Sequence, residues 1–398
     1  MKGQFYSCIG IRGGKKELQE VSRITGISLA RLSYLNEQNK LPDDHELSVI
    51  EELLGVSRIS IMLEMGIFDH KLISALRKHG SVITELLKND LEAENDSLPP
   101  LSVHQTNFGT LYHGNCMDVM RTIQSGTVDL VFADPPFNLD KHYASNMDDD
   151  LPEHKYLNWC EDWISECVRI LKDGGSMFLW NIPKWHSILS KFVDDRLTFR
   201  NWIATDIKFS LPIQGKLYPS HYSLLYFIKG SKPTTFSPDR LSMDVCRKCY
   251  HEIKDYGGYK DKMNPKGINI SDVWLDIPPV RHNKYKKRKE ANELSIKLLD
   301  RIIEMSSKPG DLVFDPFGGS GTTYVVAEMK ERRWIGVELG PTDGITERLN
   351  NLDQERAYLK SLRADYNRLF TIEAKKQRVK KGIWVEETYN SVLFEKLD

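Results

Sequence analysis

The apolar residues of this chain follow one rhythm near its start and another over most of its length. Between Leu18 and Gly66 they recur every three or four positions, which predicts a series of short helices. From Leu111 onward, short apolar runs alternate with segments of helical period. That alternation is typical of a parallel sheet with helices on both faces. The sequence therefore predicts a small all-α N-terminal domain followed by an α/β domain.

One apolar run ends in a turn whose residues could take part in binding or catalysis. The run 128–133 predicts a buried strand, and Asp134, Pro135, Pro136 and Phe137 follow it directly. Because neither proline has an N–H group, the turn presents carbonyl oxygens beside the Asp134 carboxylate, with an aromatic ring close by. Such acceptors suit a planar base that carries an exocyclic amine. An ordinary exit from a strand could have the same residues, so this turn alone supports both interpretations equally.

A second motif changes that balance. The run 312–314 predicts a strand that leads into a glycine-rich turn, Asp315 to Thr323, which opens a helix. Its three glycines let a ligand approach the backbone, and a helix N-terminus favours a negative group. No lysine follows Gly321, which excludes the spacing of a P-loop. The next predicted strand ends at Glu338, whose carboxylate can accept hydrogen bonds from both hydroxyls of a ribose.

Together the two motifs resemble those of the DNA amino-methyltransferases, and their order resembles the permuted beta group of that family. The resemblance covers residues 106 to about 350. It implies a Rossmann-like methyltransferase sheet, S-adenosylmethionine as cofactor and double-stranded DNA as substrate. Asp134, Pro135, Pro136 and Phe137 match the catalytic tetrad. By position, the residues implied to bind the cofactor are Asn115, Cys116, Asp134, Asp315, Phe317, Gly318, Gly319, Ser320, Gly321, Thr322 and Glu338.

Two positions bear on the details of this resemblance. Asn115 stands where the family often has an acid beside the cofactor adenine, and its amide could still bond to the adenine edge. Asp134 favours adenine as the target, because related enzymes that methylate cytosine more often have serine there. The prediction is methyl transfer to the N6 amine of an adenine flipped out of the duplex. Methylation of the N4 amine of cytosine is the alternative on the same scaffold.

The N-terminal helices resemble the helix-turn-helix of the Cro and CI repressor family. Gly26 would end one helix, Ser28 would cap the next, and residues 28–38 take the place of the recognition helix. By position, Arg31, Ser33 and Tyr34 would face DNA. A helical bundle for protein contacts or dimerisation would show the same pattern.

Residues 231–290 interrupt the alternation of strands and helices where the permuted beta group places its target-recognition region. The chain as a whole has a net charge of −1, so DNA binding has to come from local basic patches. Cys246 and Cys249 have no second pair of ligands at a fitting spacing, so no metal site is predicted, and zinc binding by this pair is the less favoured alternative. The residues expected to contact DNA in the second domain are His221, Lys284, Lys286, Lys287, Arg288 and Lys289.

These segments give the expected domain boundaries. We expect a helix-turn-helix-like domain at 1–70, a helix and linker at 71–105, and the catalytic half of the methyltransferase domain at 106–230. The target-recognition region follows at 231–290, the cofactor-binding half at 291–370 and a C-terminal tail at 371–398.

Composition narrows the class of protein further. No run reaches the roughly 18 apolar residues of a membrane span, and six scattered cysteines do not form a disulfide framework. We therefore expect a cytoplasmic protein with no membrane contact. A homodimer and a cognate restriction nuclease are further partners that this class allows. Two other functions fit less well: a DNA-binding regulator with an inactive methyltransferase domain, which a cofactor-binding assay would identify, and an RNA methyltransferase, since nothing in residues 1–100 resembles an RNA-binding module.

Overall fold

A computed structural model of the chain describes residues 5–37, 40–68, 70–87, 100–139, 149–207, 212, 214–215, 217–278, 293–364 and 366–388. The chain divides into two compact units. The first contains the N-terminal helices and part of residues 138–162, and the second contains a large sheet. Within the described ranges, no helix combines the length and the apolar character that crossing a membrane requires.

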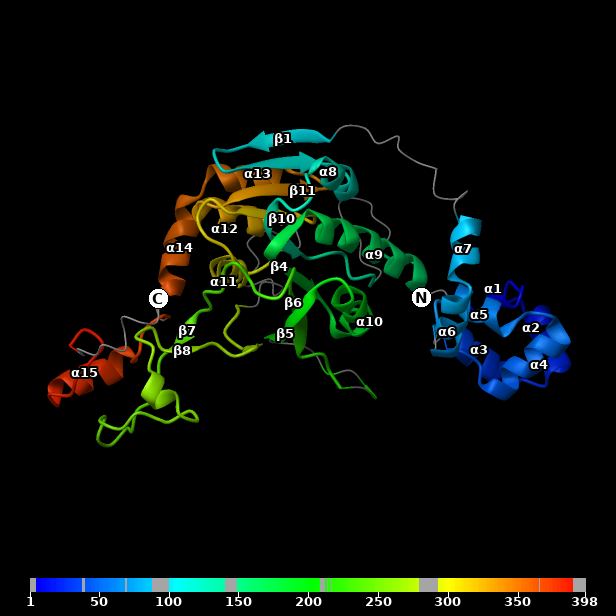
Figure 1. Ribbon diagram of the computed structural model, residues 1–398, viewed down its shortest axis with the longest axis horizontal. Coiled ribbons are helices and arrows are strands. Elements are labelled where there is room, and N and C mark those ends of the chain that lie inside the picture. The colour runs from blue at the N-terminus through cyan, green and yellow to red at the C-terminus, as the bar shows by residue number, and fades with distance from the viewer. Residues whose placement is uncertain are drawn as a thin grey trace. The chain divides into compact units, whose positions relative to one another are not determined.

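The N-terminal unit consists of short helices (blue in Figure 1). Its core includes Leu32 and Leu35, both fully buried. Gly26 ends α2 with a left-handed φ of 72°, and the Ser28 hydroxyl accepts the Arg31 N–H at the start of α3, so a tight turn joins this helix pair. The expected single helix after residue 70 is wrong, because that segment forms two helices. The helices are α1 (Phe5–Cys8), α2 (Lys15–Thr25), α3 (Leu29–Glu37), α4 (Asp44–Leu54), α5 (Arg58–Glu64), α6 (His70–Lys78) and α7 (Gly80–Leu87).

A nine-stranded sheet forms the centre of the second unit. Its strands lie in the order β1 (Leu101–Gln105), β2 (Gly109–His113), β11 (Arg333–Glu338), β10 (Leu312–Asp315), β3 (Val128–Ala133), β4 (Leu171–Asn181), β6 (His221–Ile228), β5 (Thr198–Asp206) and β9 (Val273–Trp274). The five strands from β2 to β4 are parallel, whereas β1 and β6 are antiparallel to their neighbours. The predicted α/β class is confirmed. The sheet begins at Leu101, inside the segment that we expected to be linker.

Helices cover both faces of this sheet, as the buried central strands require (Figure 1). One face packs Leu130 and Phe132 of β3 into a core with Phe178 and Tyr226, whose rings stack at 4.4 Å. The helices on that face are α11 (Ile296–Ser306), α12 (Thr322–Met329), α13 (Asp343–Asn350) and α14 (Asp353–Arg363). The other face carries α8 (Cys116–Thr122), the C-terminal half of α9 (Glu153–Ile170) and α10 (Pro183–Asp194).

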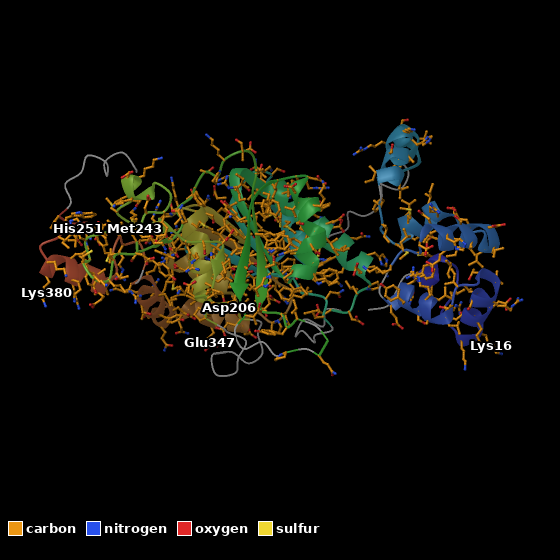
Figure 2. The ribbon with its side chains drawn as sticks, turned by 90° about the horizontal axis from the view of Figure 1, so that it is seen from below. Lys16, Asp206, Met243, His251, Glu347 and Lys380 are labelled. Atoms are coloured by element: carbon orange, nitrogen blue, oxygen red, sulfur yellow. The ribbon has the colours of Figure 1, made fainter. Side chains whose placement is uncertain are left out.

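Residues 240–270 and 366–388 together form a small lobe, here called the C-terminal lobe, with a core of its own. Met243, Leu369, Phe370 and Ala374 are buried in that core. The expected tail at 371–398 is wrong where the chain is described, because α15 packs into this core. Figure 2 shows Met243 and His251 of the first segment in the same region as Lys380 of the second. The elements of the lobe are β7 (Arg240–Leu241), the 3₁₀ helix η1 (Tyr259–Lys262), β8 (Ile268–Asn269) and α15 (Ile372–Lys380).

Candidate active site

Four neighbouring parallel strands bring residues of distant segments to one edge of the sheet. Gly114 and Asn115 follow β2, Glu338 ends β11, Asp315 ends β10, and Asp134 follows β3. The sheet grows outward in both directions from the β10–β3 pair, so this edge contains its topological switch point. In open α/β sheets, ligands bind outside the carboxyl ends of the strands at such a point.

Asp315 is fixed by hydrogen bonds at the centre of this edge. One carboxylate oxygen accepts the Phe317 N–H at 2.9 Å, and the other accepts the Thr323 hydroxyl at 2.5 Å. Burial raises the pKa of Asp315 well above its ordinary value, and the negative charges of Asp134 and Glu338 raise it further, against the opposing effect of the hydrogen bonds. Asp134 and Glu338 therefore each lie near enough to Asp315 to repel its carboxylate. A cationic ligand at this edge would relieve that repulsion.

The glycine-rich turn after β10 is packed too tightly for side chains. A Cβ atom on Gly318 would lie 2.9 Å from the Tyr324 hydroxyl oxygen. Gly321 precedes α12 with a φ of 75°, and a Cβ there would lie 2.6 Å from a methyl carbon of Ile345. Neighbouring protein atoms thus require glycine at both positions, and at Gly321 the backbone conformation requires it as well.

Glu338 connects the turn to the neighbouring strand. Its two carboxylate oxygens accept the N–H groups of Gly319 and Gly340, each at 2.6 Å, and its backbone carbonyl accepts the Gly114 N–H at 3.0 Å. Burial raises the pKa of Glu338, although these backbone hydrogen bonds act in the opposite direction. Each carboxylate oxygen has a second lone pair, so the residue can also accept a ligand hydroxyl.

Asn115 has a structural task at the same edge. Its side-chain oxygen accepts the Met117 N–H at 3.0 Å and so caps α8. Its NH₂ group can still donate to a ligand and its oxygen keeps a second lone pair, so the adenine-edge role expected from the sequence stays a prediction. Cys116, also predicted near the cofactor, is buried, and burial raises the pKa of its thiol to about 12.

A hydrogen bond from Trp185 fixes the Asp134–Phe137 turn. The fully buried indole of Trp185 donates to the carbonyl oxygen of Phe137 at 2.6 Å. The Phe137 ring is 2% exposed and lies 6.1 Å from the Tyr222 ring. Asp134, Phe137, Trp180 and Tyr222 line a cavity of about 50 Å³. That volume suits one or two water molecules, so a nucleobase could enter only if the walls of the cavity move apart.

The predicted DNA contacts have different outcomes. His221 begins β6, next to the carboxyl end of β4, so it lies at the same edge as Asp134. Tyr34 is 47% exposed. Arg31 forms two hydrogen bonds to Glu46, at 2.8 and 2.9 Å, and its side chain is 37% exposed, so its contact with DNA stays a prediction. Lys284, Lys286, Lys287, Arg288 and Lys289 lie outside the described residues.

The sequence did not point to three residues that shape the site. Besides Trp185, Tyr324 accepts the Val337 N–H and donates to the Asp315 carbonyl, both at 3.0 Å, which joins β10 to β11. Arg348 donates to the Ser320 carbonyl at 3.1 Å and pairs with Glu355 at 2.9 Å. Each of these side chains contacts a residue distant in sequence or a backbone atom. Contacts of these two kinds produce no recognisable pattern in the local sequence.

The fold is an α/β sheet whose parallel strands bring Asp134, Asp315 and Glu338 to one carboxyl edge, where open α/β sheets bind ligands. A family model described as DNA methylase, for N6 and N4 methyltransferases, matches residues 128–342. The chain belongs to this family and is a DNA methyltransferase of the N6/N4 type. Enzymes of this family use S-adenosylmethionine as methyl donor.

Known proteins show how far the similarity extends. The chain is 44% identical to the Type II methyltransferase M.BamHI of Bacillus amyloliquefaciens, over 94% of this chain and 89% of the relative. It is 31% identical to the DNA adenine methyltransferase YhdJ of Escherichia coli K12, over 64% of this chain and 87% of the relative. Among solved structures, the cytosine-N4-specific PvuII DNA methyltransferase is similar with a TM-score of 0.45 and 20% identity, covering 65% of this chain and 93% of that one.

Proposed function

We propose that this methyltransferase transfers a methyl group from S-adenosylmethionine to the N6 amine of an adenine flipped out of double-stranded DNA. The observation that carries the proposal is the position of Asp134. Its carboxylate follows β3 beside Phe137, at the edge of the sheet where Asp315 and Glu338 end the adjoining strands. The acceptor for a base amine and the groups for a cationic cofactor are thus parts of one site.

S-adenosylmethionine supplies an electrophilic methyl group on a positively charged sulfur atom. In the proposed complex, Glu338 accepts the ribose hydroxyls through its remaining lone pairs. The glycine-rich turn and Asp315 hold the methionine part, and the NH₂ group of Asn115 faces the adenine edge. The carboxylates of Asp134, Asp315 and Glu338 favour the positive charge.

The chain's own residues then have to activate a poor nucleophile. The lone pair of the adenine N6 amine is delocalised into the ring. Hydrogen bonds from that amine to the Asp134 carboxylate and the Pro135 carbonyl would favour a tetrahedral nitrogen and free the lone pair. Attack of this nitrogen on the methyl carbon would break the carbon–sulfur bond, and the amine proton would leave by way of Asp134 or water. The positive charge that develops on the amine is stabilised by the Asp134 carboxylate.

Moving the base out of the duplex costs free energy that binding to the protein has to offset. Flipping costs a few kcal/mol, and stacking on an aromatic ring returns about 1–3 kcal/mol per base. Phe137 and Tyr222 both line the cavity beside Asp134. A base inserted against these rings would widen the present space of about 50 Å³ and take the place of part of their mutual contact.

Replacement of Asp134 tests the proposed role. Asp134→Ala should abolish methyl transfer while the affinities for S-adenosylmethionine and for DNA stay within a few-fold of wild type, as measured by calorimetry and fluorescence anisotropy. Retained turnover would contradict the catalytic role of Asp134. If the wild-type protein itself bound no S-adenosylmethionine, it would be a DNA-binding regulator rather than an enzyme.

We further propose that the α2–α3 pair of the N-terminal unit binds DNA as a helix-turn-helix. The support is the tight turn between Gly26 and Ser28 and the exposed Tyr34 on α3. Tyr34→Ala should weaken DNA affinity without changing cofactor affinity or the melting temperature. Unchanged DNA affinity would instead favour a role of these helices in protein contacts.

A further inference from the structure

The C-terminal lobe joins two segments that are more than a hundred residues apart. Arg240 and Asn367 are connected by a backbone hydrogen bond of 2.9 Å, and Met243 donates to the Leu369 carbonyl at 2.8 Å. Gly267 fits between the segments so closely that a Cβ atom would lie 2.1 Å from the Leu241 carbonyl oxygen. The recognition region expected at 231–290 is therefore structurally incomplete without the C-terminal segment.

Arg378 connects α15 to the turn that carries Cys246 and Cys249. Its guanidinium is fully buried between the rings of Phe370 and Trp384, at 4.2 and 4.6 Å from their centroids. From there it donates to the backbone carbonyl of Tyr250 at 2.6 Å. Since aromatic faces attract cations, these rings stabilise the buried arginine, and its hydrogen bond to Tyr250 fixes the turn to the helix.

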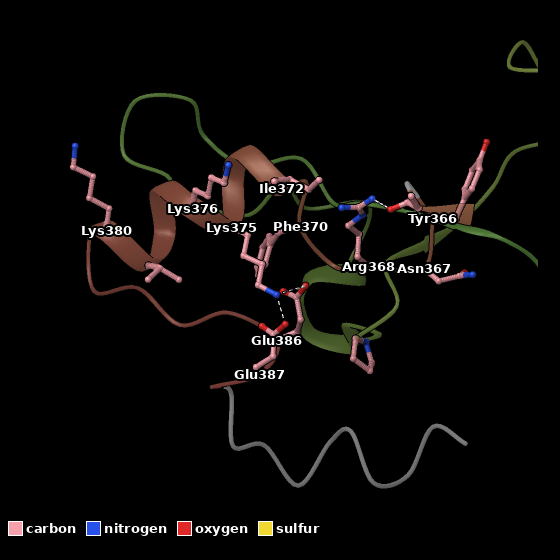
Figure 3. Close-up of a pocket in the computed structure, with 13 residues that line it drawn as sticks. Tyr366, Asn367, Arg368, Phe370, Ile372, Lys375, Lys376, Lys380, Glu386 and Glu387 are labelled. Atoms are coloured by element: carbon pink, nitrogen blue, oxygen red, sulfur yellow. Dashed lines mark hydrogen bonds and ion pairs between the residues drawn. The ribbon is translucent and has the colours of Figure 1, made fainter. Parts of the chain in front are cut away.

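The opposite face of α15 is exposed and positively charged. Ile372, Lys376 and Lys380 follow each other at intervals of four residues, so they lie along one side of the helix. They line a groove of about 840 Å³ (Figure 3). Lys375 is paired with Glu386 and Glu387, whereas neither Lys376 nor Lys380 has an acidic partner among the described residues.

The charge of the lobe differs in sign from that of the rest of the chain. The lobe contains thirteen lysines and arginines and seven aspartates and glutamates, a net charge of +6, so the remaining residues carry −7 of the total of −1. Arg247 and Lys248 in the turn held by Arg378 are exposed, and the Lys381 amine lies 3.5 Å from the Lys248 carbonyl. Positive charge from both segments is thus gathered in one place.

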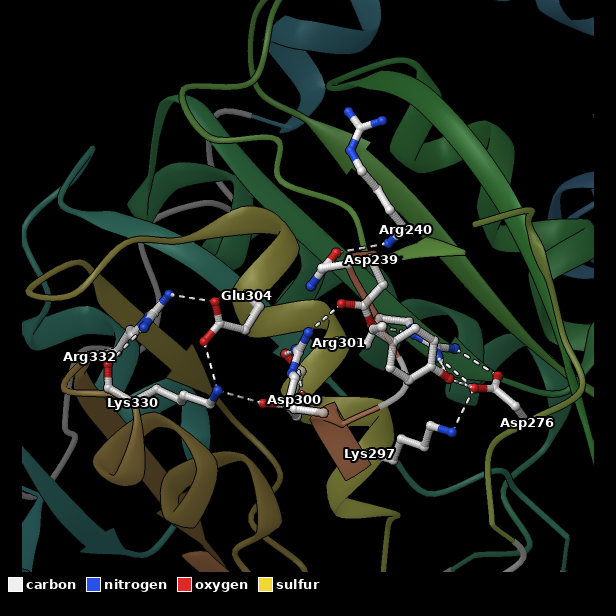
Figure 4. A network of polar contacts seen from close by, with 12 residues as sticks. Asp239, Arg240, Asp276, Lys297, Asp300, Arg301, Glu304, Lys330 and Arg332 are labelled. Carbon is white, nitrogen blue, oxygen red and sulfur yellow. Dashed lines mark hydrogen bonds and ion pairs between the residues drawn. The ribbon is translucent and has the colours of Figure 1, made fainter. Parts of the chain in front are cut away.

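A buried ionic cluster fixes the lobe to the α/β domain (Figure 4). Arg301 of α11 bonds to Asp239, immediately before the lobe, at 3.1 Å and to Asp276, shortly after it, at 2.7 Å. Arg301 also donates to the Tyr366 hydroxyl at 2.8 Å, where the second segment begins. One side chain thus contacts the chain on both sides of the first segment and at the start of the second, which attaches the lobe to α11.

We propose that the exposed face of α15 and the adjoining turn bind the phosphate backbone of DNA that flanks the target base. The inference rests on the proposed function, because it requires that DNA is the substrate. A lobe with a net charge of +6, unpaired lysines along one helix face and a fixed attachment to the catalytic domain matches a line of phosphates. The segment expected to be a tail would then contribute directly to DNA binding.

The double variant Lys376→Gln/Lys380→Gln tests the inference. Affinity for a fluorescein-labelled duplex of mixed sequence would be measured by anisotropy at several salt concentrations between about 50 and 200 mM. If both lysines meet phosphates, the slope of log affinity against log salt should become shallower by about 1.8, at about 0.9 per contact. In methyl transfer, the KM for DNA should rise while kcat and the affinity for S-adenosylmethionine stay unchanged.

Lys232→Gln/Lys308→Gln is the matched control. Both lysines are exposed, and they lie at the other edge of the sheet, after the end of β6 and before the start of β10. This variant loses the same charge and should keep the wild-type slope, as should Lys376→Arg/Lys380→Arg. If the wild-type protein binds and methylates DNA but the α15 glutamine variant keeps the wild-type slope, the inference is overturned and the proposed function is not. Wild-type protein that does not act on DNA would instead overturn the proposed function.

Discussion

Replacing Arg301 with methionine should destabilise the protein far more than the loss of an ordinary surface ion pair. The side chain of Arg301 is 1% exposed, and it lies between Asp239 and Asp276 with Trp274 stacked 4.8 Å from its guanidinium (Figure 4). Methionine fills a similar volume without strain. It removes the positive charge, however, and leaves carboxylates that were arranged around that charge.

The size of the effect follows from what remains near those carboxylates. Removing one partner of a buried ion pair costs about 3–5 kcal/mol, because the other charge stays buried. Here Asp239 keeps an ion pair with Arg363, and the Asp276 carboxylate keeps the Lys297 amine at 2.7 Å. We therefore expect the lower end of the range, about 3 kcal/mol. At about 2–4 °C per kcal/mol for a large domain, the melting temperature should fall by about 6–12 °C.

The assay is thermal unfolding followed by circular dichroism, with Arg356→Met as control. Arg356 pairs with Asp353 at 3.4 Å, and the two side chains are 56% and 100% exposed, so its loss should cost less than about 1 kcal/mol. A melting temperature of the Arg301 variant that matches the control would refute the reasoning. The difference should also depend on pH. Burial alone would raise the pKa of Asp276, but Arg301 and Lys297 lower it. The stabilisation is therefore present above the unfolded pKa of about 3.9 and is lost as the pH falls through the lower folded value.

Two further predictions concern the active site. Trp185→Phe removes the donor to the Phe137 carbonyl but keeps an aromatic ring; kcat should fall by at least about ten-fold as the catalytic turn shifts, with unchanged affinity for S-adenosylmethionine in calorimetry, and a wild-type kcat would contradict the positioning role. Glu338→Gln should weaken the affinity for S-adenosylmethionine by about 10- to 150-fold, the equivalent of one charged hydrogen bond of about 1.5–3 kcal/mol. The affinity for DNA serves as the control. An unchanged affinity for S-adenosylmethionine would exclude Glu338 from the ribose site.

Local sequence patterns were sufficient to locate the ends of the central strands. The apolar run before Asp134 and the strand-to-helix turn after Asp315 each form within a few residues, so the backbone and its hydrophobic period specify them. Parallel pairing then brings Asp134, Asp315 and Glu338 to one edge, as the topology requires. Local sequence patterns therefore predict which residues lie at that edge, and the roles of these residues are those proposed above.

Long-range contacts explain most of what the sequence did not reveal. β1 was assigned to a linker because it is a short edge strand whose residues are mostly exposed. α15 was assigned to a tail because it has only two buried positions, Ala374 and Arg378, and the hydrogen bond that joins it to the first segment reaches Tyr250, 128 residues away. The ion pair of Arg31 with Glu46 on α4 was likewise not visible in the pattern of α3, and its predicted DNA contact stays a prediction. A charged residue in sequence gives no sign of whether its partner is solvent, phosphate or another side chain.

The most direct test of the central claim is the identity of the methylated nucleoside. Double-stranded DNA would be incubated with the protein and isotopically labelled S-adenosylmethionine, digested to nucleosides and analysed by mass spectrometry, with the Asp134→Ala protein in parallel. We predict labelled N6-methyladenine with the wild-type protein and none with the variant. Labelled N4-methylcytosine would assign the same acceptors to cytosine and contradict the choice of adenine, and the absence of any labelled nucleoside would contradict the proposed methyl transfer to DNA.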